Sequence, residues 1–255
     1  MEHPWLIKNT VAQKGRYISI TPDNTELEFL SVGRILLEKG MEPVVVDTGE
    51  TEISLVCLHG NGQVQVEDQM YDVSPCDGVY IPQECQFSVQ TEGDVDLVEC
   101  IAPVTKKYDP AYVSFAKVKE SPDLHQTLGE ETFIRELYTI IGTNVEASRL
   151  LIGVTFGKGG NWTSWPPHEH AASKEEVYLY FNMPRPNFGI QCVYTDGDDP
   201  EAMLPVFEDD AVIIKKGYHQ NVGVPSCGIN FVWILCGLRE GERDWSKVNF
   251  QPGFQ

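Results

Sequence analysis

Short apolar runs separated by turn-forming residues recur along the chain, and the periodicity of amphipathic helices is scarce. In the first half these runs are Arg16–Ile20, Ile53–His59, Gln63–Glu67, Gly78–Pro82, Phe87–Gln90 and Leu97–Ala102. In the second half they are Arg149–Phe156, Glu176–Phe181, Gly189–Thr195, Ala211–Lys215 and Ile229–Gly237. Regularly spaced short strands of this kind predict an all-β sandwich or barrel. Glu130–Gly142 fits a helix by its apolar spacing and a strand by its β-branched and aromatic residues.

The two sets of strands echo one another. Each contains an acidic turn, a four-residue apolar run and a second turn, at residues 76–89 and again at 209–219. Two copies of such a unit suit a duplicated small barrel. The intervening segment is polar, charged and weakly periodic, which is typical of a linker. We predict one barrel in residues 1–102, a linker at 103–129 and a second barrel in 130–255.

Composition and charge narrow the classes of function. The chain has 255 residues, and 38 acidic against 19 basic residues give a formal net charge of −19. A field of this sign repels polyphosphate, so we expect neither nucleic acid nor an anionic membrane as a partner. No apolar run reaches the ~20 residues of a membrane span, and the N-terminal residues do not have the pattern of a secretory signal. Seven cysteines without a C-x-x-C pair indicate reduced thiols, and together these features predict a cytoplasmic protein.

Three of the six histidines lie in two patterned segments of the second half. His168 and His170 are two residues apart, so in an extended strand both side chains point to one face. Glu175 and Glu176 follow across a short turn, and His219 comes after a glycine on a later hairpin. Imidazoles with a carboxylate form a first shell for a divalent ion. The competing interpretation is that H-x-H stands by coincidence on a solvent-exposed edge.

These two segments resemble the paired motifs of the cupin superfamily. The run from Gly160 to His170, with Asn-Trp-Thr-Ser-Trp-Pro-Pro-His-Glu-His, is similar to the signature of the 5-deoxy-glucuronate isomerase family of inositol catabolism. The related 5-keto-4-deoxyuronate isomerase shares the Pro-Pro-His-x-His element and the Glu-Val-Tyr element that begins at Glu176. The resemblance implies an all-β bicupin of two tandem double-stranded β-helix (jelly-roll) barrels. It also implies a metal-dependent aldose–ketose isomerisation of a deoxy-uronate sugar acid.

The resemblance further implies one divalent ion, held by His168, His170, Glu176 and His219. Zn²⁺ or Mn²⁺ is the expected metal, and Fe²⁺ or Ni²⁺ also suits the ligands. General cupin spacing favours Glu175 instead. Strand alternation and the family's Glu-Val-Tyr element favour Glu176, because they place the tyrosines on the metal's face. The first half has no matching ligand set, so we expect the metal in the second half only.

A sugar acid needs local cations and hydroxyls in a chain of this net charge. Those nearest the motifs are Lys174, Tyr178 and Lys216, with Arg185 and Lys215 as further cations, and we predict substrate contacts from the first three. The catalytic base is not assigned. The same ligands would serve a cupin dioxygenase or a non-catalytic sugar-acid-binding cupin, and the isomerase of pectin degradation is a further alternative. A homo-oligomer is compatible with the sequence.

Overall fold

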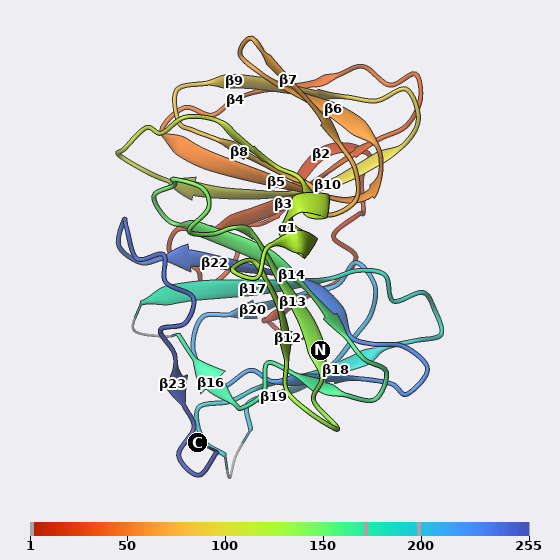
Figure 1. Ribbon diagram of the computed structural model, residues 1–255, viewed down its shortest axis with the longest axis vertical. Coiled ribbons are helices and arrows are strands. Elements are labelled where there is room, and N and C mark those ends of the chain that lie inside the picture. The colour runs from red at the N-terminus through yellow and green to blue at the C-terminus, as the bar shows by residue number, and fades with distance from the viewer. Residues whose placement is uncertain (1–2, 171–172, 198–199, 255) are drawn as a thin grey trace.

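The apolar runs of the sequence form antiparallel β-sheets in the computed structural model, which describes residues 3–170, 173–197 and 200–254 (Figure 1). Some strands are buried on both faces and are apolar throughout, as in β8 (Gly78–Ile81) and β20 (Ala211–Ile214). Others alternate buried and exposed positions, as in β19 (Ala202–Val206). The first pattern indicates a strand covered on both sides and the second a strand with one face in water. The prediction of an all-β fold is confirmed.

Two sheets form the first half of the molecule, at the top of Figure 1. The six-stranded sheet has the order β11 (Ala111–Val113), β8, β5 (Thr51–Gly60), β10 (Val95–Pro103), β3 (Ser31–Leu37) and β2 (Gly15–Ile20). The four-stranded sheet has the order β4 (Val44–Asp47), β9 (Gln86–Gln90), β6 (Gly62–Val66) and β7 (Gln69–Val73). An apolar cluster that includes Ile35, Leu55, Val64, Phe87 and Val89 fills the space between them.

The second half repeats this arrangement below the first. Its seven-stranded sheet has the order β1 (Leu6–Ile7), β20, β17 (Lys174–Tyr180), β22 (Asn230–Gly237), β14 (Leu150–Gly157), β13 (Arg135–Ile141) and β12 (His125–Leu128). The four-stranded sheet has the order β15 (Trp162–Thr163), β21 (Asn221–Gly223), β18 (Gly189–Val193) and β19. A pair, β16 (His168–Glu169) and β23 (Asn249–Phe250), lies at the lower left of Figure 1. Glu130–Gly142 is thus resolved as a strand, because Arg135–Ile141 pairs with β12 and β14.

The two large sheets pack face to face at the centre of the molecule. Their shared core contains Val56, Val98 and Cys100 from the first half and Val177 and Ile234 from the second, all of which are buried. The remaining apolar cluster lies inside the second barrel and includes Tyr178, Tyr180, Phe231 and Trp233. Each large sheet therefore has two buried faces, one toward its own barrel and one toward the other half.

Two buried glutamates fasten this central interface, one from each half. Glu52 on β5 accepts hydrogen bonds from the backbone amides of Ser148, Arg149 and Leu150 at 2.7–2.8 Å. Glu175 on β17 in turn accepts the backbone amides of residues 28, 29 and 30 at 2.6–2.9 Å. Both side chains are fully buried. We call this pair the glutamate clasp; hydrogen bonds to a buried ionised group are among the stronger ones in proteins.

The chain also crosses between the halves near its start and in the segment predicted as a linker. β1 pairs with β20, so residues 6–7 belong to the sheet of the second half. Residues 103–129 begin with the end of β10 and then form β11 in the first sheet, helix α1 (Phe115–Glu120) between the halves, and β12 in the second sheet. The segment is therefore structured, because Val118 and its neighbours bury apolar side chains in the central core.

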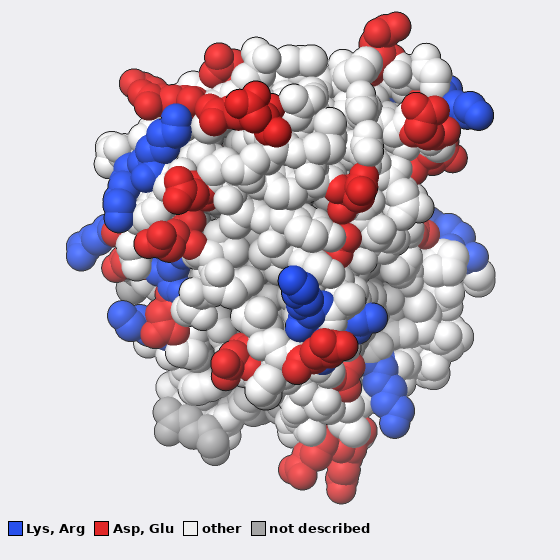
Figure 2. All heavy atoms as spheres, turned by 45° about the horizontal axis from the view of Figure 1, so that its top comes forward, with Lys and Arg blue, Asp and Glu red and all other residues white. Residues whose placement is uncertain are grey.

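The surface carries the excess acidic charge in a dispersed form. In Figure 2 acidic side chains are interspersed with basic ones, and no continuous basic stripe crosses the described part of this face.

No described helix is long and apolar enough to cross a membrane. All seven cysteines are unpaired, as expected from their spacing. The absence of a nucleic-acid partner and the cytoplasmic location stay predictions.

The clasp predicts a large loss of stability from a small chemical change. Glu52→Gln keeps the side chain's size but replaces one of the two acceptor oxygens by an NH₂ group, which would face the backbone N–H groups that the carboxylate now accepts. We therefore expect the free energy of unfolding to fall by about 2–4 kcal/mol. Urea denaturation measures it. The control Glu50→Gln changes an exposed side chain two residues away and should shift stability by no more than about 0.5 kcal/mol. Equal midpoints for the two variants would contradict the clasp.

Candidate functional site

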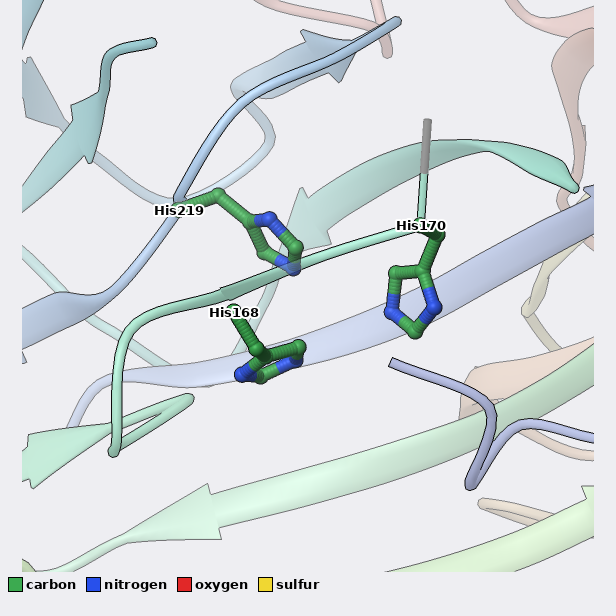
Figure 3. A group of neighbouring side chains, drawn as sticks. All are labelled: His168, His170 and His219. Carbon is green, nitrogen blue, oxygen red and sulfur yellow. The ribbon is translucent and has the colours of Figure 1, made fainter. Parts of the chain in front are cut away.

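Three histidines converge inside the second barrel from two separate segments. His168 lies on β16, His170 follows it, and His219 comes after β20 (Figure 3). The ring centroids of His168 and His219 are 4.7 Å apart, and the other two pairs are 5.4 and 5.6 Å apart. One ring nitrogen from each lies within 4.8 Å of the others. Among the described residues this is the one group of three or more potential ligands placed so closely.

Backbone carbonyls orient two of the three rings. His168 Nδ1 lies 2.9 Å from the Pro166 carbonyl oxygen, and His219 Nδ1 lies 2.9 Å from that of Gly217. A proton on Nδ1 leaves the Nε2 lone pair free, which is how metal-binding histidines are commonly held. Gly217 has a φ of +97°, and a Cβ there would lie 2.7 Å from the Tyr194 carbonyl oxygen, so the turn requires glycine.

Strand alternation separates the two adjacent glutamates of β17. Glu176 points into the barrel, where its Oε2 lies 3.0 Å from His219 Nε2 and 3.8 Å from His170 Nε2. Glu175 points the other way, into the glutamate clasp. Tyr178 shares the inward face with Glu176, whereas Val177 packs in the central core. This placement supports Glu176 as the carboxylate of the site, and the ligand set stays a proposal.

The donor atoms of the group have the character expected of metal ligands. Among described residues, His170 Nδ1 is buried without a hydrogen-bond partner, and the buried Glu176 Oε2 and His219 Nε2 lie 3.0 Å apart without a well-formed hydrogen bond. Such orphaned atoms are uncommon in native structures and call for an ion or another unseen partner. Burial and the mutual repulsion of the rings lower the pKa of His168 and of His170 to about 3, so both are neutral at pH 7. The residues therefore fit a divalent ion.

A cavity of about 320 Å³ opens beside these side chains, within the range typical of small-molecule sites. Its polar lining, apart from the ligand group, consists of Arg135, Thr155, Ser164, Tyr178 and Ser246. Aromatic rings form much of the rest, from Trp165, Phe231, Trp233, Trp245 and Phe250. Aromatic faces and a few convergent polar groups suit the apolar and polar sides of a sugar.

Three consecutive residues hold three side chains of this cavity. Ser164 Oγ is 2.8 Å from the Tyr178 hydroxyl, the Trp165 carbonyl accepts a 2.7 Å hydrogen bond from Arg135 Nη2, and the Pro166 carbonyl contacts His168. We call residues 164–166 the anchor loop. Its presence explains why the Trp-x-Ser-Trp-Pro-Pro lead-in accompanies the histidine motif in this sequence.

Of the predicted substrate contacts, Tyr178 lines the cavity and the two lysines do not. Lys174 is buried, and its ammonium donates to Ser173 Oγ at 3.1 Å. Lys216 is exposed. The cation that does line the cavity is Arg135, which sequence reasoning missed. It lies more than thirty positions before His168, in the segment whose conformation was ambiguous, and the pairing of β13 with β14 brings it to the site.

Comparison with known proteins identifies the family. The model of the KduI/IolB family matches residues 5–254. The chain belongs to this family. One relative is the 5-deoxy-glucuronate isomerase of Geobacillus kaustophilus (strain HTA426), which is 26% identical over 242 residues, covering 88% of this chain and 86% of that protein. The predicted family resemblance is thereby confirmed, as is the prediction that the chain is an isomerase.

Solved structures agree with the fold. An IolB-like protein from Salmonella typhimurium LT2 superposes with a TM-score of 0.87 at 24% identity, over 98% of this chain and 97% of that one. A cupin 2 conserved barrel domain protein from Leptotrichia buccalis gives a TM-score of 0.54 at 14% identity, over 94% and 98% of the two chains. These neighbours confirm the predicted cupin fold.

The two glutamates of β17 provide a test of the ligand set. We expect the purified protein to hold about one divalent ion per chain, measured by elemental analysis, and Glu176→Gln to lose most of it, because a neutral amide is a poor ligand. Glu175→Gln is the matched control: it should retain the metal while melting at a lower temperature, since it weakens the clasp. Full metal occupancy in Glu176→Gln, or loss in Glu175→Gln alone, would reverse the assignment.

Proposed function

We propose that this protein is a metal-dependent aldose–ketose isomerase of a deoxy-uronate sugar acid, most like 5-deoxy-glucuronate isomerase. The observation that carries the proposal is the convergence of three imidazoles with the Glu176 carboxylate beside a sugar-sized cavity. His168, His170 and Glu176 line that cavity. Family membership supports the substrate class, because the relative from Geobacillus kaustophilus is a 5-deoxy-glucuronate isomerase.

The chemistry of an aldose–ketose isomerisation matches this cavity. A proton moves between adjacent carbons through an enediolate, and negative charge develops on oxygen. A bound Zn²⁺ or Mn²⁺, held by the three imidazoles and Glu176, would supply Lewis-acid stabilisation of that charge. The lining of the cavity is mainly apolar, and a low local dielectric strengthens the electrostatic interactions within it.

Tyr178 is placed to hold a proton during this reaction. Its ring centroid is 5.7 Å from that of His219, and its hydroxyl bonds to Ser164. Burial, and then the nearby charge of Glu176, raise the pKa of Tyr178 well above its ordinary value. The hydroxyl therefore stays protonated at neutral pH and serves as a hydrogen-bond donor to a substrate oxygen, not as the base that removes the carbon-bound proton.

The proposed activity has a direct test. We expect the metal-loaded protein to convert 5-deoxy-glucuronate in D₂O with deuterium incorporation at the carbon that gains the proton, and without oxygen uptake. Faster turnover of 5-keto-4-deoxyuronate would instead assign the pectin-pathway substrate. Oxygen consumption would indicate a dioxygenase, and binding without exchange of either substrate would indicate a non-catalytic cupin.

The role of Tyr178 predicts a selective loss. Tyr178→Phe removes the donor and keeps the ring that stacks on Phe231, so we expect kcat to fall about 10²-fold while the metal content is unchanged. Steady-state kinetics with elemental analysis measures both quantities. An unchanged kcat would rule out proton donation from this hydroxyl.

A further inference from the structure

Arg135 is a cation in the cavity wall that no carboxylate of the described chain neutralises. Its guanidinium has five N–H donors, and two of them bond to the carbonyls of Phe133 at 3.1 Å and Trp165 at 2.7 Å. Burial lowers its pKa. A partly buried cation without a counter-ion is costly, so its retention calls for an anionic partner.

Other arginines of the protein show how this chain ordinarily satisfies a guanidinium. Arg34 pairs with Asp96 and Asp209, and Arg16 pairs with Glu99. Arg243, which is half-buried, donates to three backbone carbonyls and is stabilised by the charge of Glu52. Arg135 has no carboxylate partner, donates to two backbone carbonyls and faces a cavity.

Three other cations of the second half have partners outside the cavity. Lys215 lies 2.7 Å from a carboxylate oxygen of Glu28 and 3.7 Å from one of Glu175, on the side of the central interface. Arg185 stacks on the ring of Phe207, 3.6 Å from its centroid. Burial lowers the pKa of Lys174, and the nearby carboxylates of Asp244 and Glu242 oppose this effect. None of these three lines the cavity in the part of the chain that the structure describes.

We propose that Arg135 binds the carboxylate of the sugar-acid substrate. The inference rests on the proposed function, and it assigns a binding residue to the carboxylate end of the substrate, which does not take part in the isomerisation. A planar guanidinium matches the two oxygens of a carboxylate, and three of its N–H groups are not used by the bonds described above. The net charge of −19 makes such a local cation necessary, because the protein's overall field repels a uronate.

The anchor loop relates this carboxylate subsite to the metal ligands. Arg135 is tied to the Trp165 carbonyl, and His168 is tied to the next carbonyl along the chain. The two ends of a bound sugar acid would therefore be located by side chains fixed to adjacent peptide groups. This arrangement aligns the reacting carbons relative to the metal ligands, which is the contribution that a positioning cation makes to catalysis.

The alternative is that Arg135 only braces the anchor loop. In that case its removal would weaken the loop and the metal site without changing the preference for a charged ligand. The two interpretations differ in how the protein treats a carboxylate and its neutral amide. D-glucuronate and D-glucuronamide form such a matched pair, and their binding can be followed through the fluorescence of Trp165, Trp233 and Trp245 in the cavity wall.

The experiment compares both ligands in the wild-type metal-loaded protein and three variants. We expect the wild type to bind glucuronate at least about 10-fold more tightly than glucuronamide, and Arg135→Gln to weaken glucuronate binding by about 30-fold or more and abolish the preference. Arg135→Lys should retain part of the preference, because it keeps the charge and loses the planar fork. Lys216→Gln, which changes an exposed cation, should behave as the wild type.

Several outcomes would overturn the inference. The first is a wild-type protein that binds glucuronate and glucuronamide equally, or binds neither. The second is an Arg135→Gln variant that keeps both its metal and its preference for glucuronate. The third is a Lys216→Gln variant that loses this preference to the same extent as Arg135→Gln. If Arg135→Gln fails to fold, the wild-type comparison and Arg135→Lys decide. A charge preference without isomerisation would refute the proposed function alone. Isomerisation with an unchanged KM in Arg135→Gln would refute the carboxylate assignment alone.

Discussion

Buried carboxylates that lack a full set of donors are unstable, and this constraint determines how the two halves of the protein meet. Glu52 and Glu175 each take three backbone amides from the opposite half, so neither carboxylate is satisfied until the large sheets are in their final register. The clasp therefore fixes the position of β17 as well as the interface. Because side chains alternate along a strand, fixing Glu175 outward also fixes Glu176 inward, toward the histidines.

The two barrels have diverged in what fills them. The first is packed with aliphatic and aromatic side chains such as Val64 and Phe87, and among its described residues no group of ligands converges as in the second. The second gives up part of its core to a cavity, and its aromatic residues line that space. The first half contributes a sheet face that buries the outer face of β17 and β22, which lets the site strand be apolar on one side and polar on the other.

Sequence patterns predicted strands that carry a local apolar run or an alternation of apolar and polar residues, and missed several whose burial depends on distant partners. β3 was missed because its run is interrupted by Arg34, a buried cation that pairs with Asp96 and Asp209. β19 was missed because Pro205 interrupts an edge strand. Periodicity alone could not decide between helix and strand for Glu130–Gly142, since pairing with β14 decides it.

The same distinction holds at the site. The histidines were predicted because metal ligands recur at short spacings such as H-x-H. Glu176 was predicted from strand alternation and from the resemblance to the family's Glu-Val-Tyr element, since spacing alone favoured Glu175. The structure brings these four side chains together. The cations were sought close to the motifs in sequence, and Lys174 and Lys216 lie outside the cavity lining. Arg135 could not be found this way, because no local pattern marks a cation whose partner is a ligand. Arg135 begins β13, which pairs with β12 and β14, and its place in the cavity wall follows only from the order of the strands in that sheet.

The pairing of β1 with β20 has a consequence for the order of events during synthesis. Asn9 donates to Asp210, 201 residues further along the chain, and Leu6 pairs with Val212 beside it. A domain that folds from its N-terminus while the ribosome still adds residues can complete the first barrel early. The opening residues must wait until β20 has emerged, because they have no partner before then. The contacts of β1 are thus among the last to form, when β20 joins the sheet of the second barrel.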